Sequence, residues 1–153
     1  MAVLAQNTSI AGADGQPRAS KHGIYNLRFA DADRTTRYLH FKTNCPKANT
    51  AMCMVEAVGY SYGTAQPIRC SWGWYSYIDG NLYNIALHNL AAGMVPNSVY
   101  HSVDNFVCFS TTARDLYYLG VILNCYNTAP SAGAGFDLLI TANAGTATAG
   151  NYF

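Results

Sequence analysis

The stretch that decides the fold runs from Val55 to Tyr77 and reads VEAVGYSYGTAQPIRCSWGWYSY. Its residues alternate as in two β-strands, because successive side chains of a strand point to opposite faces of the sheet. The segment GTAQP at residues 63–67 interrupts the alternation, since Gly and Pro supply turn dihedrals that other residues resist. The stretch therefore predicts two antiparallel strands joined by a turn.

The alternation assigns each residue of this hairpin to a face. On the first strand, one face carries Val55, Ala57, Gly59 and Ser61, and the other carries Glu56, Val58, Tyr60 and Tyr62. On the second strand, one face carries Ile68, Cys70, Trp72 and Trp74, and the other carries Arg69, Ser71, Gly73, Tyr75 and Tyr77. A hairpin with this much aromatic surface is not stable alone, so we expect further strands to cover it.

Other apolar or alternating segments recur along the chain, with Gly, Pro, Asn or Asp between them. The expected strands are residues 24–30, 37–43, 50–62, 68–77, 82–89, 99–103, 105–110, 116–126 and 136–142. In the segment 82–89, Tyr83, Ile85 and Leu87 are expected to point inward, and the apolar segment 116–126 predicts a central strand buried on both faces. Because no long helical stripe is present, the pattern predicts an all-β fold, an antiparallel β-sandwich of the jelly-roll-like kind.

The chain divides into three expected parts. Residues 1–23 are rich in Ala, Gly and Ser without a sustained period, which predicts an extended N-terminal arm. Residues 24–142 form the sandwich domain, and the Ala/Thr/Gly-rich residues 143–153 form a C-terminal tail. No apolar run approaches the roughly 18 residues of a membrane span, and residues 1–7 do not have the pattern of a signal peptide. We therefore expect a protein made in the cytosol, with no membrane partner.

The composition predicts a protein that associates. Half of the residues are apolar or aromatic and only 11% are charged, against roughly 25% in an ordinary soluble domain. Surfaces with so little charge tend to associate, and the 12 tyrosines suit interfaces because the ring buries area while the hydroxyl stays hydrogen-bonded. The net charge of +1 gives no nucleic-acid footprint.

The five cysteines predict neither a zinc site nor a disulfide framework. Their number is odd, and no C-x-x-C spacing occurs. Most of them fall inside apolar strands, where Cys behaves as a small hydrophobic residue. We expect free thiols.

No constellation of catalytic or metal-binding residues emerges from the chain. The four histidines are scattered and match no metal-ligand spacing, and paired catalytic carboxylates are not apparent. The sequence therefore favours a non-enzymatic protein with no cofactor and no metal site. Glu56, the one glutamate, forms a candidate ion pair with Arg69 on the neighbouring strand. Trp72 and Trp74 are expected in the core or at an interface between copies, with stacking on a sugar as the alternative.

Five short motifs follow one another along the chain. They are H-x-K-T-N at residues 40–44, E-x-x-G-Y-x-Y-G-x-x-x-P-I at 56–68, W-x-W-Y-x-Y at 72–77, D-N-x-V at 104–107 and Y-Y at 117–118. This order resembles a small β-sandwich domain of tailed-phage virion proteins, the fibre-head domain, over about residues 38–126. The resemblance implies a non-enzymatic and typically trimeric virion protein.

The chain differs from a fibre because it carries no coiled-coil heptads and no repeats that would build a shaft. We therefore expect a capsid decoration or cement protein on the virion surface, a homotrimer that clamps neighbouring copies of the major capsid protein. In this hypothesis the basic arm contacts the shell through Leu4, Ile10, Arg18 and Lys21. The core or trimer interface is formed by Tyr60, Tyr62, Trp72, Trp74, Tyr75 and Tyr77. The alternative is the receptor-binding tip of a tail fibre or spike, with a host surface glycan as its ligand.

Overall fold

The computed structural model describes residues 4–11, 17–28, 36–48, 50–128 and 141–145, with side chains for residues 26–28, 36–48 and 50–126. The described strands are β1 (Leu4–Ala11), β2 (Pro17–Arg28), β3 (Thr36–Pro46), β4 (Ala51–Ser61), β5 (Gln66–Ser76), β6 (Leu82–Ala92), β7 (Pro96–His101), β8 (Phe106–Thr111), β9 (Arg114–Asp115), β10 (Leu119–Thr128) and β11 (Thr141–Gly145). Within these ranges there is no helix, and so none that is long and apolar enough to cross a membrane.

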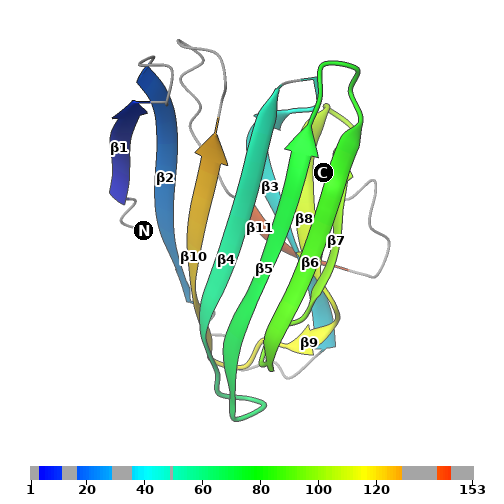
Figure 1. The fold of residues 1–153 in the computed structure, drawn as a ribbon. Helices are drawn as coiled ribbons and strands as arrows, with labels where there is room; N and C mark the ends of the chain where they lie inside the picture. The colour runs from blue at the N-terminus through cyan, green and yellow to red at the C-terminus, as the bar shows by residue number, and fades with distance from the viewer. Residues whose placement is uncertain (1–3, 12–16, 29–35, 49, 129–140, 146–153) are drawn as a thin grey trace.

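The strands form two antiparallel sheets that pack face to face. One sheet has the order β1-β2-β10-β4-β5-β6 and the other has the order β11-β3-β8-β7, with β9 paired to β3. Figure 1 looks onto the six-stranded sheet, with β3, β8 and β11 behind it. The chain alternates between the sheets from β2 to β3 to β4, and again from β8 to β10. This arrangement confirms the predicted all-β antiparallel sandwich.

The hairpin of β4 and β5 lies between β10 and the edge strand β6 in the six-stranded sheet, and it contributes many of the buried core residues. Its register pairs Val55 with Trp72 and Ala57 with Cys70, and all four side chains are buried. They meet aromatic side chains of the second sheet, because the Trp72 ring lies 4.9 Å from that of Phe109 between centroids. The alternation predicted for both strands is therefore confirmed, and the face with Val55, Ala57, Cys70 and Trp72 is the inner one.

The turn between β5 and β6 shows how local chemistry sets an element boundary. Gly80 has a φ of +79°, in the left-handed region that favours glycine. The Asp79 carboxylate accepts a hydrogen bond of 2.9 Å from the backbone N–H of Asn81, in the manner of an Asx turn. These residues end β5 and return the chain along β6, as the Asp-Gly-Asn sequence predicts.

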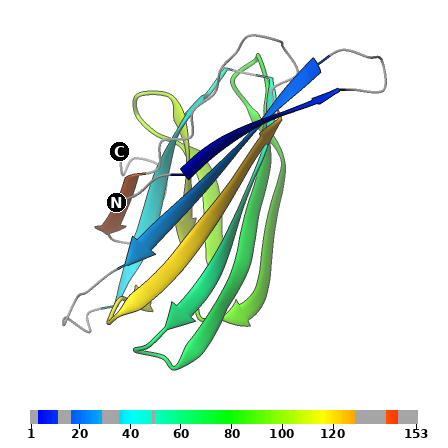
Figure 2. The same ribbon diagram turned by 90° about the vertical axis from the view of Figure 1, so that its left-hand side faces the viewer.

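The N-terminal region differs from the expected separate arm. Residues 4–11 pair with residues 17–24 to form the β1–β2 hairpin, and residues 20–28 of β2 pair with β10. Figure 2 shows this hairpin continuing the six-stranded sheet beside β10. The expected boundary at residues 23 and 24 thus lies inside β2, and the expected strand 24–30 begins earlier, at Pro17. Backbone pairing to an adjacent strand needs no apolar period, which explains why the side-chain pattern did not reveal it.

Two elements carry more exposed apolar surface than the sequence predicts. β10 is buried on one face only: Val121 and Leu123 are buried, whereas Ile122 between them is 41% exposed. β6 is an edge strand, and the residues expected to point inward, Tyr83, Ile85 and Leu87, are 42%, 47% and 39% exposed. Both predictions of burial were wrong, because an antiparallel sheet can leave one face uncovered and an edge strand has a neighbour on one side only.

Several strand ends also differ from the expected ones, and two of them lie in segments expected to be a loop and a tail. β3 continues to Pro46, into the segment 44–49 expected to be a loop. β11 covers residues 141–145 and pairs with β3, so a strand enters the expected tail. The remaining part of the expected last strand, residues 136–140, lies outside the described residues.

Candidate interaction surface

The two tryptophans belong to the core. Trp72 is fully buried and Trp74 is 3% exposed. The indole Nε1 of Trp72 donates a hydrogen bond of 2.9 Å to the backbone oxygen of Ser110 on β8, which ties the two sheets together. Of the two readings of this pair, the core is correct, and neither ring is available to stack on a sugar.

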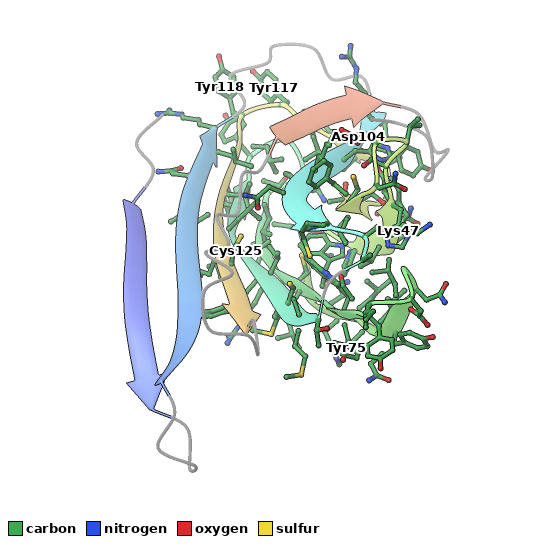
Figure 3. The ribbon with its side chains drawn as sticks, turned by 90° about the horizontal axis from the view of Figure 1, so that it is seen from above. Lys47, Tyr75, Asp104, Tyr117, Tyr118 and Cys125 are labelled. Atoms are coloured by element: carbon green, nitrogen blue, oxygen red, sulfur yellow. The ribbon has the colours of Figure 1, made fainter. Side chains whose placement is uncertain are left out.

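The tyrosines predicted with them lie elsewhere, in two clusters at opposite ends of the hairpin. Tyr62 lies near Tyr117 and Tyr118, with centroid distances of 5.7 and 6.0 Å. Tyr77 lies between Tyr75 and Tyr83 at the other end, with distances of 5.8 and 6.2 Å. Figure 3 shows Tyr117 and Tyr118 side by side and Tyr75 well away from them. Tyr60, Tyr62 and Tyr77 are exposed, and Tyr75 is half-buried.

The solvent side of the six-stranded sheet is apolar along its central strand. We define the outer face by five side chains, each between 41% and 60% exposed: Met52, Met54, Val58 and Tyr60 of β4, and Ile122 of β10. The register places Ile122 directly beside Val58, so the residues are contiguous. The solvent side of an antiparallel sheet is ordinarily polar, and a contiguous apolar patch of this kind marks an interaction site.

One acid and one base lie within the outer face. The register sets Glu56 opposite Ser71 and Val58 opposite Arg69, so the two charged residues are diagonal neighbours. The one ion pair between residues that the structure describes joins Lys42 to Asp104, and the expected Glu56–Arg69 pair is not formed. Diagonal positions on adjacent strands are about 7–8 Å apart between Cα atoms, and these two side chains do not close that distance. Arg28 on β2 is also exposed on this side, in register with Gly120.

A hollow adjoins the outer face where β5 and β6 separate. Two residues of β6, Asn84 and Ile85, lie opposite Trp74 alone, which makes a bulge, and Asn84 has a φ of +50°. The hollow has a volume of about 540 Å³ and is lined by Thr50, Met52, Gly73, Trp74, Tyr75 and Asn84. Gly73 carries no side chain and so leaves space on the sheet surface. The lining includes Met52, Trp74 and Tyr75, so the hollow suits an apolar side chain better than a charged group.

The polar contacts between Lys42 of β3 and the turn from β7 to β8, which we call the rim, are structural. The Lys42 ammonium donates a hydrogen bond of 2.5 Å to the Asp104 carboxylate, and Ser102 Oγ donates another of 2.6 Å. These two hydrogen bonds, the one from Lys42 above all, lower the pKa of Asp104 below its ordinary value. His40, two residues before Lys42 on β3, is buried, with Nδ1 2.8 Å from the Tyr100 hydroxyl. It is therefore a hydrogen-bonded structural residue.

The five cysteines are free and buried, as the sequence predicts. Burial raises the pKa of Cys70 to about 12 and that of Cys108 to about 11. Thiols with such pKa values are protonated at neutral pH, and the thiolate is the nucleophilic form. These side chains therefore act as small hydrophobic residues of the core.

No group of three His, Cys, Asp or Glu side chains that could hold a metal ion occurs among the described residues.

The expected arm residues Leu4 and Ile10 lie on β1, and Arg18 and Lys21 lie on β2. Their side chains are outside the described set, so their role stays a prediction.

The sequence analysis did not identify Met52, Met54 and Ile122 as surface residues. An alternation in which both faces are apolar is the signal that indicates them.

The comparisons with known proteins give no relative. No protein-family model, no curated protein and no solved structure matches this chain. The structure is an antiparallel β-sandwich with exposed apolar side chains on its outer face, and the resemblance to virion domains stays a prediction.

Proposed function

We propose that this protein is a non-enzymatic structural component of a phage virion, a capsid decoration protein that binds neighbouring capsid subunits at the virion surface. The apolar outer face of the six-stranded sheet carries the proposal. Five exposed apolar side chains on the middle strands contribute little to the sandwich core, and a partner that covers them gains their burial. A low charge content supports the same reading, since few charged groups must be desolvated when such a surface is covered.

The physical task of such a protein is to add interface area between subunits. Anything that binds the assembled shell and not its separated subunits stabilises the shell by mass action. The major capsid protein is the proposed partner, and the resemblance predicts that the decoration protein binds it as a homotrimer. Arg18 and Lys21 of β2 are proposed to meet acidic groups of the shell.

The copy number of the protein in purified particles tests this function. Quantitative mass spectrometry against an isotope-labelled copy of the chain measures its ratio to the major capsid protein. A decoration protein is expected at a ratio of the same order as the capsid subunit. Absence of the chain from particles contradicts the proposal, and a few copies per particle favour the second candidate below.

The role of the basic residues needs point variants instead of a truncation. Removing residues 1–23 would delete β1 and part of β2, and it would expose the edge of β10. Charge reversal of Arg18 and Lys21 to Glu keeps the strand backbone and is expected to weaken binding to capsids. Binding equal to that of the wild type would contradict a role for these residues.

A second candidate is the receptor-binding tip of a tail fibre or spike. The cluster of Tyr62, Tyr117 and Tyr118 favours it, because Tyr62 is 61% and Tyr118 47% exposed beside the β4–β5 turn. Aromatic rings on an exposed turn offer apolar faces with hydroxyl groups for a host surface glycan. Competition of the purified protein with virions for host cells tests it: blocked adsorption that is lost in Tyr62→Ala supports the tip.

A further inference from the structure

The outer face carries charge in a form that complements itself. Glu56 is half-buried and Arg69 is exposed, and neither side chain forms a hydrogen bond or an ion pair with any other residue that the structure describes. Both lie among exposed apolar side chains, where covering an unpaired charge would be costly. A partner for this face must therefore bring a base to Glu56 and an acid to Arg69. A second copy of the same face brings both.

The strand register gives the symmetry that achieves this. Glu56 lies at the level of Ser71, and Arg69 lies two residues along, at the level of Val58. A two-fold axis in the interface plane, crossing the strands at the level of Ala57 and Cys70, exchanges these two levels. It places Glu56 of one copy over the position of Val58 in the other, one strand from Arg69. The lateral offset is about 4.8 Å and packed sheets lie about 10 Å apart, so the two backbones are about 11 Å apart, a distance that a Glu and an Arg side chain reaching toward each other span.

We infer that two copies of this chain dimerise through the outer faces of their six-stranded sheets, with Glu56 of each copy paired to Arg69 of the other. The inference rests on the proposed function in taking the outer face as an association surface. It assigns that face to a second copy of the chain, replaces the homotrimer implied by the resemblance with a dimer, and leaves contact with the shell to the β1–β2 hairpin, where Arg18 and Lys21 lie. The same axis brings Met54 of one copy over Tyr60 of the other, and methionine sulfur packs favourably on aromatic rings. Nothing described covers this face in Figure 1, where it points toward the viewer.

The available area is sufficient for a stable contact. The face includes five strands, β2, β10, β4, β5 and β6. At ordinary strand spacing and rise, ten residues on each strand span about 800 Å² of sheet plane. Specific interfaces bury about 800 Å² per partner. A two-fold contact is isologous, so one patch must carry both members of each pair, as this face does, whereas a cyclic trimer joins two different patches.

Charge reversal and remixing test the dimer with the full chain. In Glu56→Arg each dimer would hold two Arg–Arg contacts, and in Arg69→Glu two Glu–Glu contacts. Like charges across an interface repel each other, so we expect each variant alone to dimerise about 100-fold more weakly, measured by sedimentation equilibrium. An equimolar mixture of the two variants restores both pairs and is expected to form a 1:1 heterodimer. The double variant E56R/R69E is expected to dimerise like the wild type.

Controls separate the contact from general charge effects. Lys47→Glu changes a charge just beyond the end of β3, in the second sheet and off the outer face, and is expected to shift the dissociation constant less than about threefold. Should Glu56→Arg fail to fold, judged by circular dichroism, Glu56→Gln removes the attraction without adding repulsion and is expected to weaken the dimer about tenfold.

Three outcomes overturn the dimer: a wild-type mass of one or three chains, single variants that associate like the wild type, or a mixture that stays monomeric. The failure is distinguishable from failure of the proposed function. A wild-type monomer that is abundant in particles contradicts only the dimer. A wild-type dimer that is absent from particles contradicts only the decoration role.

Discussion

The two faces of β4 contrast sharply although their residues are similar. Val55 is fully buried against the second sheet, and Val58, three residues later, is 41% exposed on the outer face. Cys53 is 5% exposed on the inner face, whereas its neighbour Met54 is 43% exposed on the outer face. Apolar side chains thus occupy both faces of one strand, and only one face belongs to the core. The difference teaches that hydrophobicity alone does not locate a core, and that the second face needs another explanation.

Burial energetics supply that explanation. Complete burial of a Val, Leu or Met side chain contributes about 1.5–3 kcal/mol. The outer-face residues gain only part of this in the single chain, and they gain the rest when a partner covers them. The inner face is accordingly expected to control folding and the outer face association.

The largest expected difference between the faces concerns chemical access. All five thiols belong to the interior, so we expect none to react with 5,5′-dithiobis(2-nitrobenzoic acid) in the native protein and all to react in denaturant. The reagent reaches a buried thiol only in an unfolded molecule, and about one molecule in 10³ or fewer is unfolded at any time. Rapid native labelling of any thiol, followed by absorbance at neutral pH, would show that the interior is open.

Truncation of an inner aromatic residue is expected to have the next largest effect. Trp72→Ala removes a fully buried ring and its hydrogen bond to Ser110, and it should lower the free energy of unfolding by about 3–5 kcal/mol. Tyr60→Ala on the outer face is the matched control, and it should change the stability of the monomer by less than about 1 kcal/mol. Urea titrations at a concentration where the chain is monomeric measure both, and equal losses would erase the distinction between the faces.

Two glycines of the six-stranded sheet differ in how closely other atoms approach them, and their substitution is expected to have a smaller effect on stability. A Cβ atom at Gly59 would lie 2.1 Å from the backbone oxygen of Gly120, because β4 and β10 approach closely there. Gly59→Ala should therefore cost about 1–3 kcal/mol through forced backbone shifts. At Gly73 the nearest atom, Cβ of Ala86, would be 3.6 Å away, and Gly73→Ala should be tolerated. Similar denaturation midpoints for the two variants would contradict the close approach.

The smallest effect is expected at the rim, in the dependence of stability on pH. The hydrogen bond from Lys42 holds the folded-state pKa of Asp104 below its ordinary value. A carboxyl group of this kind stabilises the fold above its unfolded pKa of about 3.9, and the contribution is lost as the pH falls through the lower folded value. Asp104→Asn should therefore be less stable than the wild type at neutral pH, with the difference vanishing in acid. A difference in thermal midpoint that is constant from pH 2 to 7 would argue against this ion pair.

Much of the fold is predictable from the hairpin sequence, because strand alternation is a local property. The alternation of Ile68, Cys70, Trp72 and Trp74 indicates one buried face, and the structure buries all four. The strand β1 and the first residues of β2 were not predictable in this way. Their pairing depends on backbone hydrogen bonds to a neighbour that the side-chain pattern does not specify.

The candidate surface was only partly predictable for a related reason. An apolar run such as YLGVIL in residues 118–123 is equally consistent with a strand covered on both faces and with one left open for a partner. The sequence does not show which layers cover which strand, and so the exposure of Ile122 emerged only from the sheet order. The Glu56–Arg69 pair failed within one chain because the register sets the two residues diagonally instead of opposite each other.

Methionine oxidation tests most directly whether the outer face is an association surface. Met52 and Met54 are 60% and 43% exposed, and the fully buried Met94 serves as an internal control in the same chain. Peroxide treatment followed by peptide mass spectrometry gives the oxidation rate of each residue as the protein concentration rises. We predict that Met52 and Met54 oxidise readily at high dilution and become protected as copies associate, while Met94 is protected throughout. Oxidation of Met52 and Met54 at an unchanged rate in the associated protein would contradict the account.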